Sequence, residues 1–310
     1  MLNIIQPKIE DFKKTSIDFF IVASGYESRA RTQAEKYAIQ AKNKIALGFS
    51  SEKDDIIRKQ NDKILSKLGF SISIINGEES TNIKLFKIIK EIEKYALGQG
   101  HTNILIDYSS MTRNWYSYLI YGLISIKNKC KISIYLGYSH AAYVPYDGHQ
   151  TLNRIVAPLF GYCDLNVPNK PTALIIGLGN EPNRIYGLKQ YFDAVQYIFY
   201  TDKSYNEKYS KEIEKLNSEI LNETNPRNVF KFPIHDLIYT NYILKNLCHT
   251  LLKDFRVVIA PCGPKPFALL AMINALSIND TIEVWRISPG HKIGKVDRKP
   301  TGLISLIKID

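Results

Sequence analysis

The chain has 310 residues, of which 45% are hydrophobic and 23% are charged. This balance excludes a disordered protein, and at roughly 150 residues per domain the length predicts two domains. The 41 basic and 30 acidic side chains give a net charge of +11, which is spread over both halves of the chain. A spread excess favours acidic partners but does not indicate the basic stripe of a nucleic-acid-binding surface.

The sequence contains no run of about 18 uninterrupted apolar residues, so we expect no membrane span. Its first residues, MLNIIQPKIEDFKK, lack the basic start and the apolar stretch of a secretory signal. The four cysteines are scattered, without the spacing of metal ligands. We therefore expect a cytoplasmic protein that has no metal site and no cofactor.

The first half of the chain alternates short apolar runs with amphipathic stretches. Short β-branched runs bounded by turn residues are typical of buried parallel strands, and apolar residues at helical spacing predict the helices between them. Strands are expected at 19–23, 45–49, 72–75, 104–107 and 132–136, and helices at 28–41, 53–68, 82–97 and 111–127. Residues 141–170, rich in Tyr, Pro and Gly, are expected to form a linker with at most one short strand.

The second half repeats this alternation. Strands are expected at 173–177, 195–200, 228–232, 257–260 and 282–287, and helices at 181–191, 203–222, 235–252 and 265–276. The segment 289–301 is expected to be a basic loop, followed by a last edge strand at 302–307. We predict an α/β fold of two tandem Rossmann-like, doubly wound units with mainly parallel sheets, in domains 1–160 and 161–310.

Two segments of the first half match segments of the second half at an offset of 154 residues. Residues 17–30 match 171–184, which places Gly25 on Gly179 and Glu27 on Glu181. The same offset places 102–115 on 256–269. Because two strand–turn–helix units keep one spacing, we predict that the halves are related by internal duplication.

The matching turns follow the first and fourth strands of each predicted unit. In the usual strand order 3-2-1-4-5 these two strands are neighbours, and ligands bind beyond the carboxyl ends of such strands. We therefore predict a phosphate-binding site at each pair of turns. The candidate ligand-binding residues are Ser24, Gly25, Glu27, Arg29, Asp107, Ser109, Ser110 and Arg113 in the first half and Gly179, Glu181, Arg184, Gly263 and Lys265 in the second.

Four of these candidates are basic residues at the start of a predicted helix. A cation there opposes the helix dipole, whereas an anion bound at the free N–H groups would reverse that effect. This pattern favours an anion site at Arg29, Arg113, Arg184 and Lys265. The alternative is that the basic residues pair with nearby Glu27 or Glu181.

Catalytic candidates are fewer. Glu27 or His140 could serve as a general acid or base. However, a glutamate in a first helical turn is commonly only stabilising, and most loop histidines neither relay protons nor contact phosphate. Asp107 could orient a ribose hydroxyl or cap the following helix. Tyr108 and Trp115 could stack on a base or pack in the core. Neither a P-loop nor a complete dinucleotide fingerprint is present, since Pro182 replaces the third glycine of the latter.

The turn Gly263-Pro264-Lys265-Pro266 is similar to the GGTK-like loop after the fourth strand of CARF domains. The first-half turn Ser109-Ser110-Met111-Thr112-Arg113 departs from that pattern and places its basic residue two positions later. Together with the turn at 24–29, it also resembles uncharacterised Rossmannoid proteins of bacterial defence loci. The CARF resemblance implies paired Rossmann-like units that bind a cyclic oligonucleotide in prokaryotic antiviral defence. It also implies that the chain senses the ligand, degrades it, or passes the signal to a separate protein partner.

Three functions follow from this pattern. The first is a nucleotide-recognising module that binds a phosphorylated ligand at the strand-one and strand-four turns. The second is a hydrolase or transferase acting on a nucleotide or phosphoribosyl substrate. The third is a scaffold subunit of a larger complex associated with nucleic acid, in which the basic charge would serve a surface role.

Overall fold

The computed structural model describes residues 2–148, 153–163, 169–181, 183–203, 207–278, 282–288 and 296–310. The chain forms two compact units, which are described separately. The first unit comprises Leu2–Ala142 together with Lys295–Asp310, and the second comprises Tyr143–Gly294. Among the described residues, no helix has the length and apolar character needed to cross a membrane.

The first unit is built on a seven-stranded sheet of order β1-β13-β6-β5-β2-β3-β4. The five strands from β6 to β4 are parallel, while β13 runs antiparallel to β6 and β1 antiparallel to β13. The strands are β1 (Ile4–Ile5), β2 (Ile17–Ser24), β3 (Ala41–Phe49), β4 (Ser71–Ile75), β5 (Thr102–Asp107), β6 (Ile132–Ala141) and β13 (Pro300–Ile309).

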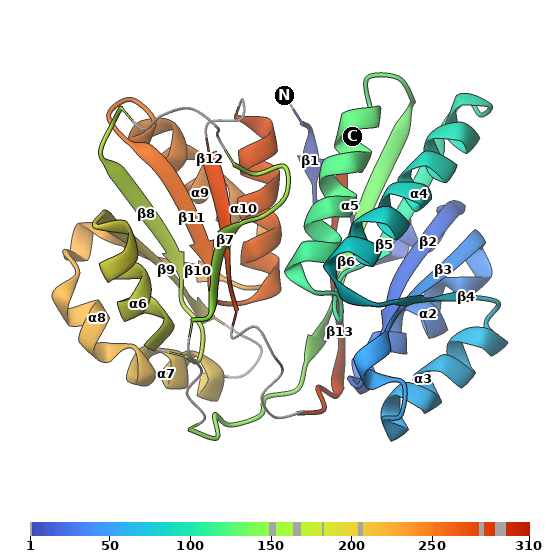
Figure 1. Ribbon diagram of the computed structural model, residues 1–310, viewed down its shortest axis with the longest axis horizontal. Helices are drawn as coiled ribbons and strands as arrows, with labels where there is room; N and C mark the ends of the chain where they lie inside the picture. Colours follow the sequence, from blue (N-terminus) through green and yellow to red (C-terminus); the bar gives the residue numbers. More distant parts are fainter. Residues whose placement is uncertain are drawn as a thin grey trace. The chain divides into compact units, whose positions relative to one another are not determined.

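Helices cover both faces of this sheet, with α2 and α3 on one face and α4 and α5 on the other (Figure 1). Every residue of the central strand β2 is buried, as expected for a strand covered on both sides. The helical segments are α1 (Ile9–Phe12), η1 (Ser28–Arg31), α2 (Thr32–Tyr37), η2 (Ala38–Gln40), η3 (Ser50–Glu52), α3 (Ile56–Lys67), α4 (Gly77–Leu97) and α5 (Arg113–Ile126).

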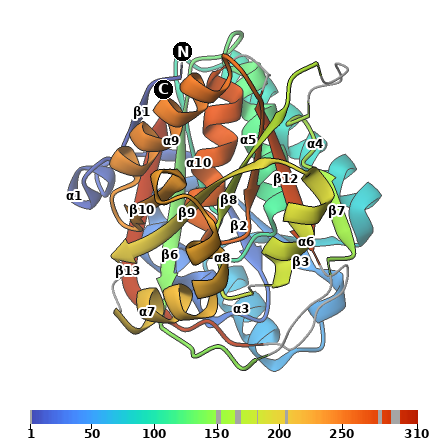
Figure 2. The same ribbon diagram turned by 90° about the vertical axis from the view of Figure 1, so that its left-hand side faces the viewer.

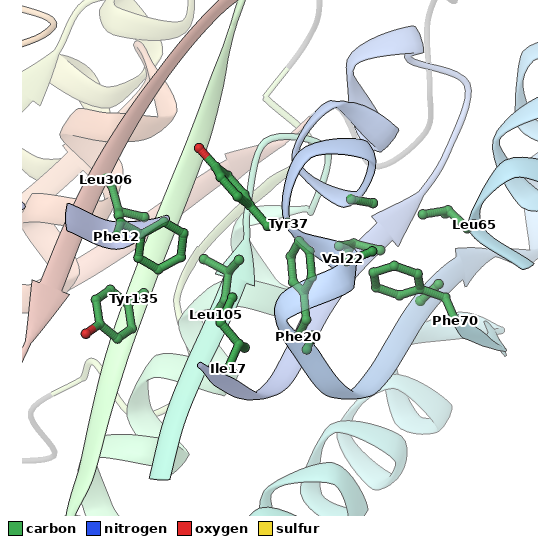
Figure 3. Close-up of a cluster of buried hydrophobic side chains, with 14 residues drawn as sticks. Phe12, Ile17, Phe20, Val22, Tyr37, Leu65, Phe70, Leu105, Tyr135 and Leu306 are labelled. Carbon is green, nitrogen blue, oxygen red and sulfur yellow. The ribbon is translucent and has the colours of Figure 1, made fainter. Parts of the chain in front are cut away.

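One hydrophobic cluster of the first unit joins distant parts of the sequence. Phe20 and Leu105 contribute from central strands, and Tyr37 contributes from α2. Figure 3 shows Leu306 of the C-terminal strand β13 packed with Tyr135 of β6 in the same cluster. The C-terminal strand is therefore part of the core of the first unit.

The second unit is built on a six-stranded sheet of order β10-β9-β8-β11-β12-β7. The strands from β10 to β12 are parallel, and β7 runs antiparallel to β12. The strands are β7 (Ile155–Pro158), β8 (Thr172–Gly177), β9 (Val195–Lys203), β10 (Val229–Pro233), β11 (Arg256–Pro261) and β12 (Ile282–Ser288).

The second sheet also carries helices on both faces, with α6 to α8 on one side and α9 and α10 on the other (Figures 1 and 2). Leu174 and Ile176 of β8 pack against Ile185 of α6 and Ile213 of α7. The helical segments are α6 (Asn183–Phe192), α7 (Glu207–Leu216), α8 (Ser218–Glu223), η4 (Pro226–Asn228), α9 (Leu237–Leu251) and α10 (Lys265–Ser277).

The predicted α/β class with two mainly parallel sheets is confirmed. Both sheets have the order 3-2-1-4-5 across their parallel strands, with β2 and β8 as the first strand of each unit and β5 and β11 as the fourth. Both sheets also add an antiparallel sixth strand beside the fifth. The internal duplication itself stays a prediction.

Several boundaries differ from those expected. The units divide after Ala142 and after Gly294 instead of at residue 160, because the two sixth strands pair with the sheet of the other sequence half. The strand expected at 302–307 extends over Pro300–Ile309 and is not an edge, since β1 pairs with its outer side. The helix expected at 28–41 is instead a series of three short helical segments, η1, α2 and η2.

Candidate functional site

The two predicted turns of the first unit meet in space. Ser110, in the turn after β5, donates a hydrogen bond from Oγ to Oε2 of Glu27, in the turn after β2, over 2.9 Å. Nε of Arg29 lies 2.9 Å from the same oxygen. The ion pair lies within the first turn and is largely buried, and the hydrogen bond from Ser110 to Glu27 links that turn to the turn after β5.

Arg29 connects these turns to the end of β6. Its Nη1 donates to the Tyr138 hydroxyl at 3.0 Å and to the Ser139 carbonyl at 3.2 Å. Burial alone would lower the pKa of Arg29, but the oxygens of Tyr138 and Glu27 outweigh it and raise that pKa. The guanidinium is therefore a permanently charged part of a buried network.

Asp107 and Ser109 organise the turn after β5. Oδ1 of Asp107 accepts hydrogen bonds from the backbone N–H of Ser109, at 2.9 Å, and from the Ser109 hydroxyl. The Ser109 oxygen in turn accepts from the backbone N–H of Ser139 at 2.7 Å. Asp107 thus stabilises its own turn, while the cap of the next helix, α5, is Thr112, which accepts from the N–H of Trp115.

Ser24 is the last residue of β2, and Gly25 follows it in the first turn. The Ser24 hydroxyl donates to Asp62 of α3 at 2.6 Å. A Cβ atom added to Gly25 would lie 3.1 Å from Oε2 of Glu52, whose same oxygen accepts from the N–H of Tyr26. The turn is therefore packed closely by side chains from α3 and η3.

Arg113 begins α5 and is half-buried, so its charge lies at the N-terminal end of that helix as predicted. Tyr108 and Trp115 are buried in packing positions. Trp115 stacks on Phe49 with ring centroids 4.1 Å apart, and burial raises the pKa of Tyr108 well above that of an exposed phenol. Both aromatic side chains therefore pack in the core instead of being placed to stack on a base.

His140 lies inside β6, not in a loop after it, because β13 pairs with β6 and extends the strand to Ala141. Its side chain is buried, and Nε2 lies 2.7 Å from the Ser305 hydroxyl of β13. His291, which like His140 follows a predicted fifth strand, lies outside the described residues.

The matching turns of the second unit meet backbone to backbone. A Cβ atom added to Gly179 would lie 2.5 Å from the carbonyl oxygen of Cys262, and one added to Gly263 would lie 2.1 Å from the carbonyl oxygen of Leu178. No real Cβ contact is that short, so only glycine allows the turns after β8 and β11 to approach this closely. Lys265 is the first residue of α10, directly after this contact.

Glu181 and Arg184 repeat the ion pair of the first unit. Nε of Arg184 lies 2.9 Å from Oε2 of Glu181. Arg29 and Arg184 therefore pair with a nearby glutamate, as in the alternative to an anion site, and their charges are already balanced by that carboxylate.

A buried asparagine holds the first turn in each unit, and neither was predicted. Nδ2 of Asn61 donates to the carbonyls of Gly25, at 2.9 Å, and Glu27, at 3.0 Å. Nδ2 of Asn217 donates to the carbonyl of Gly179 at 3.0 Å. The two asparagines are 156 residues apart in the sequence, close to the offset of the matching turns, and that spacing was the available signal.

Among the described residues, no group of three or more His, Cys, Asp or Glu side chains could hold a metal ion. No protein-family model matches the chain, and no curated protein matches it. A solved structure described as the adenylation, ketoreductase and pseudo Asub multidomain structure of a keto acid-selecting NRPS module aligns at 10% identity and a TM-score of 0.22. The alignment covers 84% of this chain and 27% of the other, so the chain spans about a quarter of that protein's length.

Proposed function

We propose that the protein recognises a nucleotide or a related phosphorylated signal at the carboxyl edge of its sheets. The observation that carries this proposal is that the strand-one and strand-four turns meet in both units, through Ser110 and Glu27 in one and through Gly179 and Gly263 in the other. In doubly wound α/β proteins the ligand lies at this place.

The meeting turns of the second unit support a phosphate-binding site within that unit. Gly179 and Gly263 bring two backbone segments together without side chains, which lets a phosphate approach N–H groups closely. Pro264 is the N-cap residue of the 13-residue helix α10, and its side chain accepts no hydrogen bond from the N–H groups of the first turn. Lys265 adds a positive charge at the same end, and charge and N–H groups together favour an anion.

The first unit supports the recognition of hydroxyl groups. Its helix α5 is capped by Thr112, and the turn after β2 carries the carboxylate of Glu27, so this edge is less suited to a bare phosphate. Glu27 and Ser110 instead form a polar pair whose oxygens suit the hydroxyls of a sugar. Arg113 would neutralise a neighbouring phosphate from the first turn of α5.

The resemblance to CARF domains extends this proposal to prokaryotic antiviral defence, with a cyclic oligonucleotide as the ligand. Mononucleotides and cyclic oligonucleotides share phosphate and ribose chemistry, so binding measurements must separate them. The probes are AMP, ATP and a cyclic tetra-adenylate, each titrated calorimetrically into the full-length chain. Analysis of the probes after incubation would reveal hydrolysis and so test the enzymatic alternative.

The decisive variant is Lys265→Ala. Loss of one charge-assisted contact to phosphate predicts that Kd rises about 10-fold or more for the probe that binds best. Lys253→Ala is the matched control, because this exposed lysine lies in the same unit and its loss changes the net charge equally. Arg113→Ala tests the first unit in the same way. Equal affinities for Lys265→Ala and Lys253→Ala, or no binding of any probe, would contradict the proposal.

A further inference from the structure

The sixth strands of the two sheets are exchanged between the halves of the sequence. Strand β7 follows β6 along the chain but pairs with β12, while β13 follows β12 but pairs with β6. Figure 1 shows the C-terminal strand β13 beside β6, and β7 beside β12. Each sheet is therefore completed by a strand from the other half of the chain.

The register of the two exchanged strands is equivalent. Leu306 pairs with Gly137 and Val156 pairs with Ile287. Val156 lies 19 residues after Gly137, and Leu306 lies 19 residues after Ile287. Because the two connections are equally long, each sixth strand could pair within its own half in the register that the exchanged strand adopts.

The segment that precedes β13 reaches the candidate site of the first unit. Oδ1 of Asp297 accepts from the backbone N–H of Ser28 at 2.7 Å, and Oδ2 accepts from the Ser28 hydroxyl at 2.7 Å. The N–H of Arg29 donates to the carbonyl of Arg298 at 3.2 Å. These bonds hold the two residues that follow Glu27 in the turn after β2.

The segment that precedes β7 contacts helix α7 of the second unit. The Tyr143 hydroxyl and the Tyr146 N–H both donate to Oε1 of Glu212 in α7, at 3.0 and 3.1 Å. Tyr146 also interacts electrostatically with Glu181 and Arg184 of the turn after β8. In both units, therefore, the segment before the exchanged strand lies near the strand-one turn.

We propose that Asp297 is a positioning residue of the first unit's ligand site and that strand exchange between the halves delivers it there. By holding both donors of Ser28, Asp297 fixes the turn whose Glu27 accepts the hydrogen bond of Ser110. This inference rests on the proposed function only for its ligand, because the order of the turn can be measured without one.

The first test compares Asp297→Asn with Asp310→Asn in the full-length chain. Asp310 is the matched control, since it lies next to β13 and accepts a serine hydroxyl, that of Ser133, at 2.5 Å, but at the opposite end of the strand. For Asp297→Asn we expect the amide of Ser28 to exchange hydrogen about 10-fold faster and the affinity for the nucleotide probe to fall about 10-fold. For Asp310→Asn we expect neither change.

The outcomes separate the two proposals. Unchanged exchange at Ser28 in Asp297→Asn, or equal changes in both variants, would overturn the positioning role, because Asp297 would then only anchor the strand. If the unaltered protein binds no probe, the proposed function fails, and the exchange rate at Ser28 alone decides the role of Asp297.

The second test addresses the strand exchange itself. Ser139 pairs with Ile304 across β6 and β13, so the double variant Ser139→Cys, Ile304→Cys should form a disulfide within one chain. A hairpin within the first half would instead place Ser139 opposite Arg154, so Ser139→Cys, Arg154→Cys is the control pair. Peptide mapping under non-reducing conditions identifies the link. Failure of the first pair to link, or linkage of the control pair instead, would overturn the exchange.

Discussion

The close approach of the turns after β8 and β11 predicts a large effect for a very small substitution. In Gly263→Ala the added methyl carbon would lie 2.1 Å from the carbonyl oxygen of Leu178 and 2.9 Å from its carbonyl carbon. Both atoms belong to the backbone, so the turns must separate for the methyl group to fit. Overpacking of this kind costs about 1–3 kcal/mol, and we expect a loss toward the upper end because no flexible side chain can yield.

Gly100→Ala is the matched control. Nothing lies within 4 Å of a Cβ atom at Gly100, and its φ angle is not in the left-handed region. There the substitution only restricts the unfolded chain, which predicts a gain of about 0.4–1 kcal/mol. The two variants add the same methyl group, so their difference reports the environment of Gly263.

Unfolding in urea can be followed separately in the second unit. The chain has two tryptophans, Trp115 in α5 of the first unit and Trp285 in β12 of the second. In a Trp115→Phe background the fluorescence reports the second unit and measures Gly263→Ala, whereas in a Trp285→Phe background it reports the first unit and measures Gly100→Ala, which avoids treating two units as one transition. Equal changes in unfolding free energy for Gly263→Ala and Gly100→Ala, each relative to its own background, would refute the close approach of the turns.

Thiol reactivity and pH dependence provide two further predictions. Cys163 is exposed and should react with a thiol reagent in the native protein, whereas burial raises the pKa of Cys248 to about 12, and mass spectrometry should find it unmodified until the protein unfolds. Burial raises the pKa of Asp18, but hydrogen bonds from Lys42, the N–H of Asn103 and Tyr95 lower it by more, so the net pKa is below its usual value. A lowered pKa stabilises the folded state above the pKa of the unfolded chain, and that stabilisation is lost as the pH falls through the folded value. Asp18→Asn should therefore unfold at lower urea than the unaltered protein at pH 6, with the difference shrinking toward pH 3; a difference independent of pH would contradict this.

Local sequence patterns were sufficient to place the parallel strands of each sheet and the turns that follow them. The apolar run that becomes β2 is long enough and β-branched enough to form a strand buried on both faces, and the glycine and serine after it end that strand. The sequence also indicated Glu27 and Glu181 as possible ion-pair partners of the nearby basic residues, and both glutamates form such pairs, with Arg29 and Arg184. These properties depend on residues within a few positions of one another.

The choice of strand partner was decided only by the tertiary structure. The composition of 302–307 predicts a strand, but any strand has hydrogen-bonding groups along both edges, and nothing local specifies that β13 pairs with β6 instead of β12. The roles of Asp297 and of Asn61 follow from that packing, because each bonds a turn distant in sequence. The sequence by itself thus determined where strands and turns form, whereas long-range pairing determined which half of the chain completes each site.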